Sequence, residues 1–336
     1  TGGGCPHILA EPQRTNLITY SSDFSNAAWI KSNSTIATTT ETVSPDGTEN
    51  ASKLTVIAVQ WSGLYITGNA ASNKYSMSVF AKKGDKDWLY FVDLNGATVI
   101  AWFNISNGTL GTITNGTATI EDFGNGWYRC TYSDTNNVSN NYFQLGLSDA
   151  NNSNTPSSGG YSYIYGAQSE EGSYATSYIP TSGSTVTRNQ DIFTRDGIGS
   201  LINSTEGVLF VEMAALSDDG TNKRISLSNG TNTYRIVIGY NTVNNIQIFI
   251  LGAPAGTFSP SQSIDITLNS KIAVSWSSTE ARFYLNGSPI LVTSGDFSYS
   301  ASTLTELKLE DGAGGNNFYG KVKQLQVYKT ALTDDT

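Results

Sequence analysis

Short stretches in which apolar and polar residues alternate run through the whole chain, and segments rich in Gly, Ser, Thr and Asn separate them. Clear examples are residues 75–81 and 143–147 in the first half, and residues 246–250 and 272–276 in the second. A period of two is typical of a strand with one buried face. No segment sustains the period of a helix. The sequence therefore predicts an all-β protein made of two tandem antiparallel β-sandwiches.

The boundary between the two sandwiches is predicted from residues 161–187. Tyr161, Tyr163 and Tyr165 share one face of a strand, and the chain then becomes a polar run of Gly, Ser and Thr with a single Pro. Such a change is typical of the last strand of one β-domain followed by a linker. The predicted organisation is an N-terminal segment, a first domain and a second domain, at residues 1–10, 11–188 and 189–336.

The composition limits the classes of partner. The 336 residues are enough for two domains, only 14% of them are charged, and the net charge is −9. Lys82, Lys83 and Lys86 form the nearest basic cluster, but Asp85 and Asp87 interrupt it, so we interpret it as a solvated loop. Nucleic acid, which requires clustered Lys and Arg, is not an expected partner. No run of about 18 apolar residues is present, so no membrane insertion is expected.

The two cysteines leave an alternative open. Cys130 lies in an alternating strand, where a buried free thiol is the simpler interpretation, and a disulfide with Cys5 is the other. The chain begins without the basic end and apolar core of a signal peptide, and we take it to be a fragment of a longer protein.

Several blocks resemble known families. In the first half these are EPQRTNLITYSSDFSNAAW (residues 11–29), SPDGTENASKLT (44–55), GNGWYRC (124–130) and YGAQSEEGSYATSYIPT (165–181). They resemble a module of phage and prophage virion proteins, typically of tails or appendages, and more loosely the jelly-roll carbohydrate-binding modules attached to xylanases. In the second half, ARFYLNGSPI and GKVKQLQVYKTALTDDT resemble concanavalin A-like, laminin G-type sandwiches. The resemblance implies a jelly roll followed by a concanavalin A-like domain and transfers no binding residue.

Catalysis is not expected. The single histidine, His7, lies in a Gly- and Pro-rich terminus that cannot hold a general base in place. Glu306 and Glu310 share a face if both lie on one strand, but they are then separated by roughly 13 Å. Glycoside hydrolysis uses carboxyl groups about 5–9.5 Å apart.

Structural calcium is the only cofactor considered. Asp46 and Glu49 lie in one acidic turn, and Asp218 and Asp219 lie in another. Jelly-roll and laminin G-type modules often hold calcium through carboxylate and carbonyl oxygens. An Asp-Gly turn without metal is the favoured interpretation of both.

Aromatic residues with polar neighbours are the candidate ligand contacts, because sugar C–H faces stack on aromatic rings. The candidates are Trp61, Tyr65, Trp88 and Trp102. Trp61 has the weakest core pattern of the tryptophans, since Gln60, Ser62 and Gly63 surround it. Trp127 and Trp276 lie in alternating strands and are predicted to be core residues.

The predicted function is non-catalytic recognition of a polysaccharide or cell-surface glycan by a virion appendage protein, located on the virion or outside the cell. Other virion subunits are expected partners, and a homo-oligomer stays open. One alternative is the carbohydrate-binding region of a secreted polysaccharide-degrading enzyme. The other is a structural decoration or spacer module of the particle.

Overall fold

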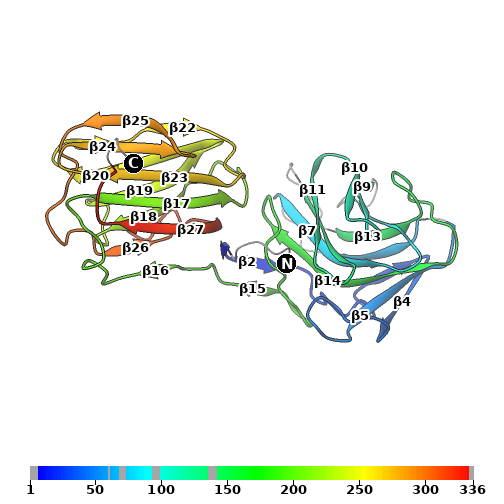
Figure 1. Ribbon diagram of the computed structural model, residues 1–336. Coiled ribbons are helices and arrows are strands. Elements are labelled where there is room, and N and C mark those ends of the chain that lie inside the picture. Colours follow the sequence, from blue (N-terminus) through cyan, green and yellow to red (C-terminus); the bar gives the residue numbers. More distant parts are fainter. Residues whose placement is uncertain (1–6, 60, 68–72, 93–98, 135–141, 333–336) are drawn as a thin grey trace. The chain divides into compact units, whose positions relative to one another are not determined.

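The computed structural model describes residues 7–59, 61–67, 73–92, 99–134 and 142–332 (Figure 1). These residues form β-strands and contain no helix, so none that could cross a membrane. The described chain divides into two compact units: residues 13–189, and residues 7–12 with 190–332. The paired strands of the main sheets run antiparallel, in agreement with the predicted antiparallel sandwiches. The predicted all-β fold class is confirmed.

The first unit contains two six-stranded sheets and one small sheet. Sheet I has, in spatial order, β10 (Thr109–Ile113), β9 (Val99–Asn104), β8 (Trp88–Val92), β13 (Tyr142–Ser148), β6 (Gly63–Thr67) and β3 (Ile30–Ser32). Sheet II has β11 (Gly116–Asp122), β12 (Trp127–Asp134), β7 (Tyr75–Lys83), β14 (Tyr161–Glu171), β5 (Ala51–Val56) and β4 (Ser34–Thr39). The small sheet pairs β2 (Arg14–Asn16) with β15 (Val186–Arg188).

The core of the first unit lies between sheets I and II. Leu89 and Phe91 of β8 enter it from one side, and Met77 and Val79 of β7 enter it from the other. Trp29 closes it beside Phe24 and Phe143, and the Trp29 indole N–H donates to the Tyr20 carbonyl at 2.8 Å. Cys130 is a buried free thiol in this core, and burial raises its pKa. Cys5 lies outside the described residues.

The second unit is built in the same way. Sheet III has β1 (Ile8–Ala10), β27 (Gly320–Tyr328), β17 (Gly207–Ala215), β23 (Ser270–Trp276), β24 (Glu280–Leu285) and β25 (Ser288–Ser294). Sheet IV has β16 (Thr194–Arg195), β26 (Glu306–Lys308), β18 (Lys223–Ser228), β19 (Arg235–Thr242), β20 (Asn245–Ala253) and β21 (Gly256–Phe258), and β22 (Ser261–Ser263) also pairs with β20.

Two local features of the second unit relate to the sequence pattern. Asn286 and Gly287 have φ values of 50° and 84° and join β24 to β25, as a type I′ turn requires. The predicted N-terminal segment contains β1, which pairs with the edge of β27. The second unit is therefore discontinuous in sequence. The sequence pattern did not indicate this, because a three-residue strand is too short to show a hydrophobic period.

A buried polar network explains why residues 165–181 are so polar. The Glu170 side chain is inaccessible and accepts hydrogen bonds from the Thr176 N–H (2.6 Å), the Thr176 hydroxyl (2.7 Å) and the Gln168 amide (2.9 Å). Arg129 donates to the Thr176 carbonyl at 2.6 Å. These bonds hold the segment after β14 against the first unit, since a buried carboxylate is tolerated only when its oxygens are paired.

Candidate functional site

The outer face of sheet I gathers the predicted aromatic residues. Leu89 and Phe91 of β8 point into the core, so the alternate residues Trp88 and Tyr90 point outward. Across the sheet, Tyr90 pairs with Trp102 of β9. Strand β8 is apolar on both faces because one face packs in the core between the sheets and the other packs in an aromatic cluster on the outer face of sheet I.

Tyr90, Val92 and Trp102 form a buried cluster on this face, and Trp61 and Trp88 pack against it while staying partly exposed. Tyr65 of β6 pairs with Gln144 of β13 in the same sheet. The fold thus brings Trp61, Trp88 and Trp102 into one cluster and places Tyr65 on the same face. Tyr90 was not among the predicted contacts, because a tyrosine inside an apolar run looks like a core residue.

Trp102 supports the site and is not open to a ligand. Its side chain is 5% exposed, its ring centroid lies 6.5 Å from that of Tyr90, and its indole N–H donates to the Ser153 carbonyl at 3.0 Å. A ring that is covered in this way cannot stack on a sugar. Of the four predicted contacts, Trp61, Tyr65 and Trp88 keep accessible surface.

The loop that covers Trp102 is fixed by a buried lysine. Lys86 is 4% exposed and donates to Asp149 at 2.5 Å and to the Ser157 hydroxyl at 2.8 Å. The interpretation of the basic cluster as fully solvated is therefore wrong for Lys86. The Lys86–Asp149 pair closes the loop because a buried ammonium requires a nearby carboxylate.

One buried polar atom of the cluster has no hydrogen-bond partner among the described residues. It is the Trp61 indole nitrogen, although the Trp61 carbonyl accepts from the Asn33 amide at 2.9 Å. The Tyr90 hydroxyl lies beside the Ser62 backbone, and burial raises the Tyr90 pKa. Buried groups of this kind are uncommon in folded proteins and indicate a missing acceptor.

Two glycines let the rings lie close to the sheet. A Cβ atom at Gly146 of β13 would lie 2.4 Å from the Tyr90 ring, and one at Gly111 of β10 would lie 2.6 Å from the Trp88 ring. The Tyr90 ring therefore lies over β13, and the Trp88 ring extends toward β10. The sequence carries no signal for this, since both glycines look like strand interruptions.

The central strands of sheet I place no charged side chain on this face. In β8, β9, β13 and β6 the described outward side chains are Trp88, Tyr90, Val92, Trp102, Asn104, Gln144, Ser148, Tyr65 and Thr67. Such a surface combines aromatic area with a few hydroxyl and amide groups, which is the usual composition of a site for an uncharged ligand.

A second aromatic cluster, on sheet II, differs because its polar atoms are paired. Trp127 is 2% exposed and donates to the Val43 carbonyl at 2.8 Å, and the Tyr165 hydroxyl donates to Asp46 at 2.8 Å. Trp127 is buried as predicted, but it belongs to this separate cluster and not to the core between the sheets. Alternation alone cannot tell a core face from an outer face that loops cover.

The four predicted calcium residues lie in two acidic turns, where most of their carboxylates accept hydrogen bonds from neighbouring groups. Asp46 accepts from Thr48, Tyr165 and Asn50. Asp219 pairs with the buried Lys223 at 2.5 Å.

Asp218 accepts from the Asn244 N–H, and Glu49 is exposed. Within the described part of the chain no three His, Cys, Asp or Glu side chains converge. These residues fit acidic turns better than a calcium site, and calcium stays an untested prediction.

The hydrogen bonds of Asp46 change its acidity. Partial burial acts to raise its pKa, but the donors Thr48, Tyr165 and Asn50 outweigh burial and lower the pKa to about 2. Asp46 is therefore ionised at neutral pH and ties the turn at residues 44–50 to Tyr165.

Glu306 and Glu310 lie closer together than the strand spacing predicts. Strand β26 ends at Lys308, and the Lys308 ammonium lies 2.8 Å from Glu306 and 3.8 Å from Glu310. The predicted separation was wrong because Glu310 is not on the strand. Burial raises the pKa of Glu310. Lys308 thus lies between the two carboxyl groups. His7 is exposed at the start of the described chain.

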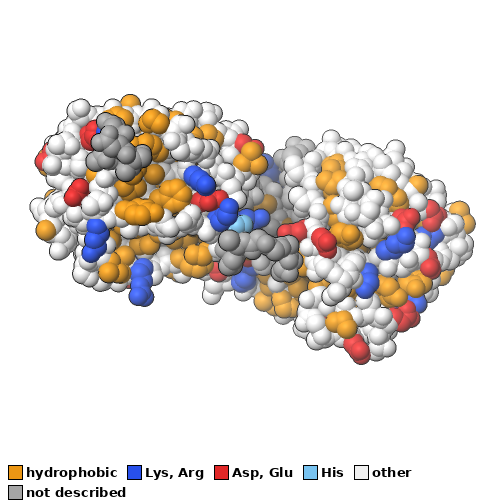
Figure 2. All heavy atoms as spheres, viewed as in Figure 1, with side chains coloured by type: hydrophobic (Ala, Val, Ile, Leu, Met, Phe, Trp, Pro, Cys, Tyr) orange, Lys and Arg blue, Asp and Glu red, His pale blue; other side chains and the backbone are white. Residues whose placement is uncertain are grey.

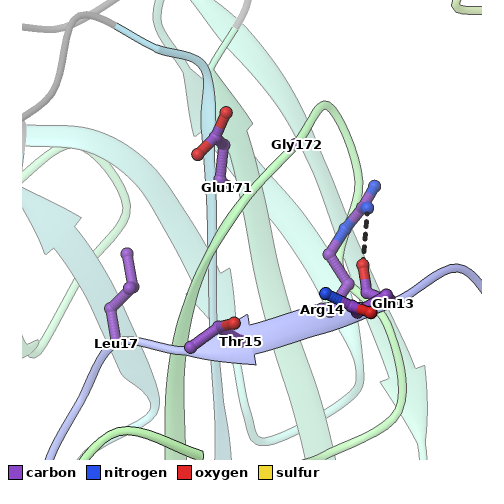
Figure 3. A pocket seen from close by; sticks show the side chains of 6 residues that line it. All are labelled: Gln13, Arg14, Thr15, Leu17, Glu171 and Gly172. Atoms are coloured by element: carbon purple, nitrogen blue, oxygen red, sulfur yellow. Dashed lines mark hydrogen bonds between the residues drawn. The ribbon is translucent and has the colours of Figure 1, made fainter. Parts of the chain in front are cut away.

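The first unit also has a hollow of about 410 Å³, which the sequence did not indicate. Figure 3 shows its walls, with Thr15 and Leu17 on one side and Glu171 on the facing segment. Arg14, also in the wall, donates to the Gln13 carbonyl at 3.1 Å and lies 5.2 Å from the Tyr174 ring centroid. The charged residues in the wall are Glu171 and Arg14, and the Arg14 guanidinium already contacts Gln13 and Tyr174. This lining does not indicate what kind of ligand the hollow would bind.

Comparisons with known proteins concern the two units separately. Residues 209–336 match the laminin G family described as "Concanavalin A-like lectin/glucanases superfamily". This match agrees with the predicted concanavalin A-like domain in the second unit. No curated protein matches the sequence.

Similar solved structures share little sequence with the chain. The CBM40 of the Ruminococcus gnavus IT-sialidase, bound to α2,3-sialyllactose, is 13% identical with a TM-score of 0.36 and covers 43% of this chain and 95% of its own. Domains LG4-5 of the mouse laminin α1 chain are 9% identical with a TM-score of 0.30, covering 80% and 86%. Sheep galectin-11 is 9% identical with a TM-score of 0.29, covering 41% and 97%.

Proposed function

We propose that this chain recognises a glycan, without catalysis, and that it belongs to a phage or prophage virion appendage that contacts a host polysaccharide. One observation carries the glycan part: the outer face of sheet I holds Trp61 and Trp88 partly exposed on a buried aromatic support. Exposing large aromatic side chains costs free energy that burial would recover. Their position is best explained by a ligand that covers them.

The chemistry of this face suits a sugar. The apolar C–H face of a pyranose stacks on an aromatic ring, while its hydroxyl groups need donors and acceptors at the edge. Gln144, beside Tyr65 in the sheet, provides an amide. The match of the second unit to a superfamily of lectins and glucanases supports a sugar ligand in general terms.

The appendage part rests on the resemblance of residues 11–29 and 165–181 to virion modules. The second block builds the network around Glu170, so the resemblance there concerns the fold and not the ligand. A location on the virion or outside the cell, with other virion subunits as partners, follows from this proposal. The low density of charge supports it, because the face drawn in Figure 2 shows scattered charges of both signs between wide uncharged areas.

Absence of catalysis is proposed on the arrangement of the acids. Glu306 and Glu310 have the Lys308 ammonium between them. This ammonium occupies the space between the two carboxyl groups in which the scissile bond of a glycoside would have to lie. Incubation of the protein with polysaccharides is expected to release no oligosaccharides. Turnover that is lost in Glu310→Gln would contradict this part.

Retention in native gels that contain soluble polysaccharides tests the glycan part. We expect at least one polysaccharide to retard the wild type, and Trp61→Ala to weaken binding about tenfold, because stacking on one ring adds about 1–3 kcal/mol in comparable cases. Phe249→Ala is the matched control, since Phe249 is a partly exposed aromatic residue of β20 in the second unit. Equal retention of the wild type and both variants would refute the proposed site.

A further inference from the structure

The two exposed tryptophans lie in one row across sheet I. Trp88 of β8 pairs with Ser148 of β13. Strand β13 continues to β6 with Gly146 opposite Gly63, so the same register places Ser148 level with Trp61. The hydrogen bond from the Leu147 N–H to the Ser62 carbonyl extends the pairing in that direction. Since neighbouring strands are about 4.8 Å apart, the Cα atoms of Trp61 and Trp88 are separated by about 10 Å.

The row of Trp88, Ser148 and Trp61 packs beside buried aromatic rings, and its two tryptophans are partly exposed to solvent. The buried rings of Tyr90 and Trp102 form the next row along the same strands. Ser148, between the two tryptophans, is fully buried, so the large rings and not the small residue form the surface. The Trp88 ring extends from β8 toward β10, away from Trp61, so the two tryptophans lie along a line that crosses the strands.

The surroundings of the row carry no free charge among the described residues of the central strands. Asn104 pairs with Trp88 at one end of the row. Two acids are adjacent to the row along the chain: Asp149 is bonded to the buried Lys86 at 2.5 Å, and Asp87 lies 2.6 Å from the Lys83 ammonium. Binding of an anionic sugar would remove water from its charged group, and no cation among the described residues of this face would pair with that group. A neutral sugar does not incur this desolvation cost.

The geometry points to a neutral polysaccharide bound along its chain, lying across the strands of sheet I with one sugar ring on Trp88 and another on Trp61. This inference rests on the proposed function and specifies its ligand. The Cα atoms of the two tryptophans are about 10 Å apart, and the Trp88 ring extends further toward β10, so the site spans at least two sugar units of a chain.

Chain length is the first test. Cello-, laminari-, xylo- and manno-oligosaccharides of one to six units are titrated by calorimetry into the full chain. For the series that binds, we expect affinity to rise about tenfold or more from the monosaccharide to the tetrasaccharide and then to level off, since the second ring contributes only when both are reached. Trp61→Ala and Trp88→Ala should each remove this rise, and Phe249→Ala should keep it.

Charge is the second test. A neutral β-glucan should bind at least about tenfold more tightly than its carboxymethylated derivative at low salt, because the added carboxylates lose hydration without gaining a partner. Equal affinity for all chain lengths, or tighter binding of the carboxymethylated glucan, would overturn the inference while the glycan-binding function stands. If no glycan of either kind binds, both fail.

Discussion

The two units share one architecture and use their outer faces differently. In the first unit, the outer face of sheet I carries an aromatic cluster with two partly exposed tryptophans and no charged side chain on its central strands. In the second unit, the outer face of sheet IV carries charged side chains. Lys308 pairs with Glu306 at 2.8 Å, and the Arg224 guanidinium lies 5.1 Å from the Phe249 ring centroid. A shared sandwich therefore does not predict a shared function.

The difference can be traced to single strands. In β8, the sequence Trp-Leu-Tyr-Phe-Val is apolar on both faces, and the outward residues build the cluster. In β20, Ile246, Ile248 and Ile250 point into the core while polar residues and Phe249 take the other face. Strict alternation is typical of a strand with one solvated face, and a continuous apolar run indicates that both faces are covered.

The largest effect is expected from removing a core tryptophan, which should destabilise one unit and leave the stability of the other unchanged. Trp276 is fully buried in the second core, and Trp29 is 1% exposed in the first. Trp276→Ala and Trp29→Ala should each cost about 3–5 kcal/mol, because they leave large cavities. Differential scanning calorimetry should show that each variant lowers one of two transitions. Trp276→Ala should also keep the glycan affinity, and a common shift of both transitions would show that the units do not unfold independently.

A smaller effect is expected where the first unit supports its aromatic face. Lys86→Met removes the bonds from the ammonium to Asp149 and Ser157. The loop over Trp102 should loosen at a cost of about 1–3 kcal/mol, since buried hydrogen bonds to a charged group are lost. Tryptophan fluorescence should shift to longer wavelength as Trp102 meets water. Lys83→Met, at an exposed lysine nearby, is the control and should leave the spectrum unchanged.

The smallest expected effect is on the pH dependence of stability, which should have opposite signs for Asp46 in the first unit and Glu310 in the second. The pKa of Asp46 in the folded first unit is about 2, below its unfolded value, so its contribution is present above the unfolded pKa and is lost as pH falls toward 2. Because Asp46 is exposed, the contribution should stay below about 1 kcal/mol. The melting temperature of Asp46→Asn should be lower than that of the wild type at pH 6 and approach it at pH 2.5.

Glu310 in the second unit has the reverse sign. Burial raises its folded pKa above the unfolded value, so its carboxylate form is disfavoured and stability is lost as pH rises through that window. Glu310→Gln should therefore match or exceed the wild type in melting temperature at pH 7 and lose that advantage in acid. The same pH trend in both variants would contradict the assignment of opposite shifts.

Part of the site could be predicted from residue types. Trp61 stood apart because polar residues surround it in the sequence, and it keeps accessible surface in the structure. Trp88 and Trp102 carried the same signal as each other, yet one is partly exposed and the other is covered by the Ser153 segment. Sequence alone cannot separate them, because a loop distant along the chain decides which ring meets solvent.

The sequence by itself determined the period of two, and with it the all-β fold, since alternation leaves a strand with one face to bury. It also determined the turn at Asn286 and Gly287, because positive φ depends on residue type. Only the tertiary structure decided that Trp61, Ser148 and Trp88 share a row, that Lys86 is buried, and that Lys308 lies between Glu306 and Glu310. The physical reason is that register, loop closure and strand ends bring together residues far apart along the chain, and local patterns carry no information about such pairs.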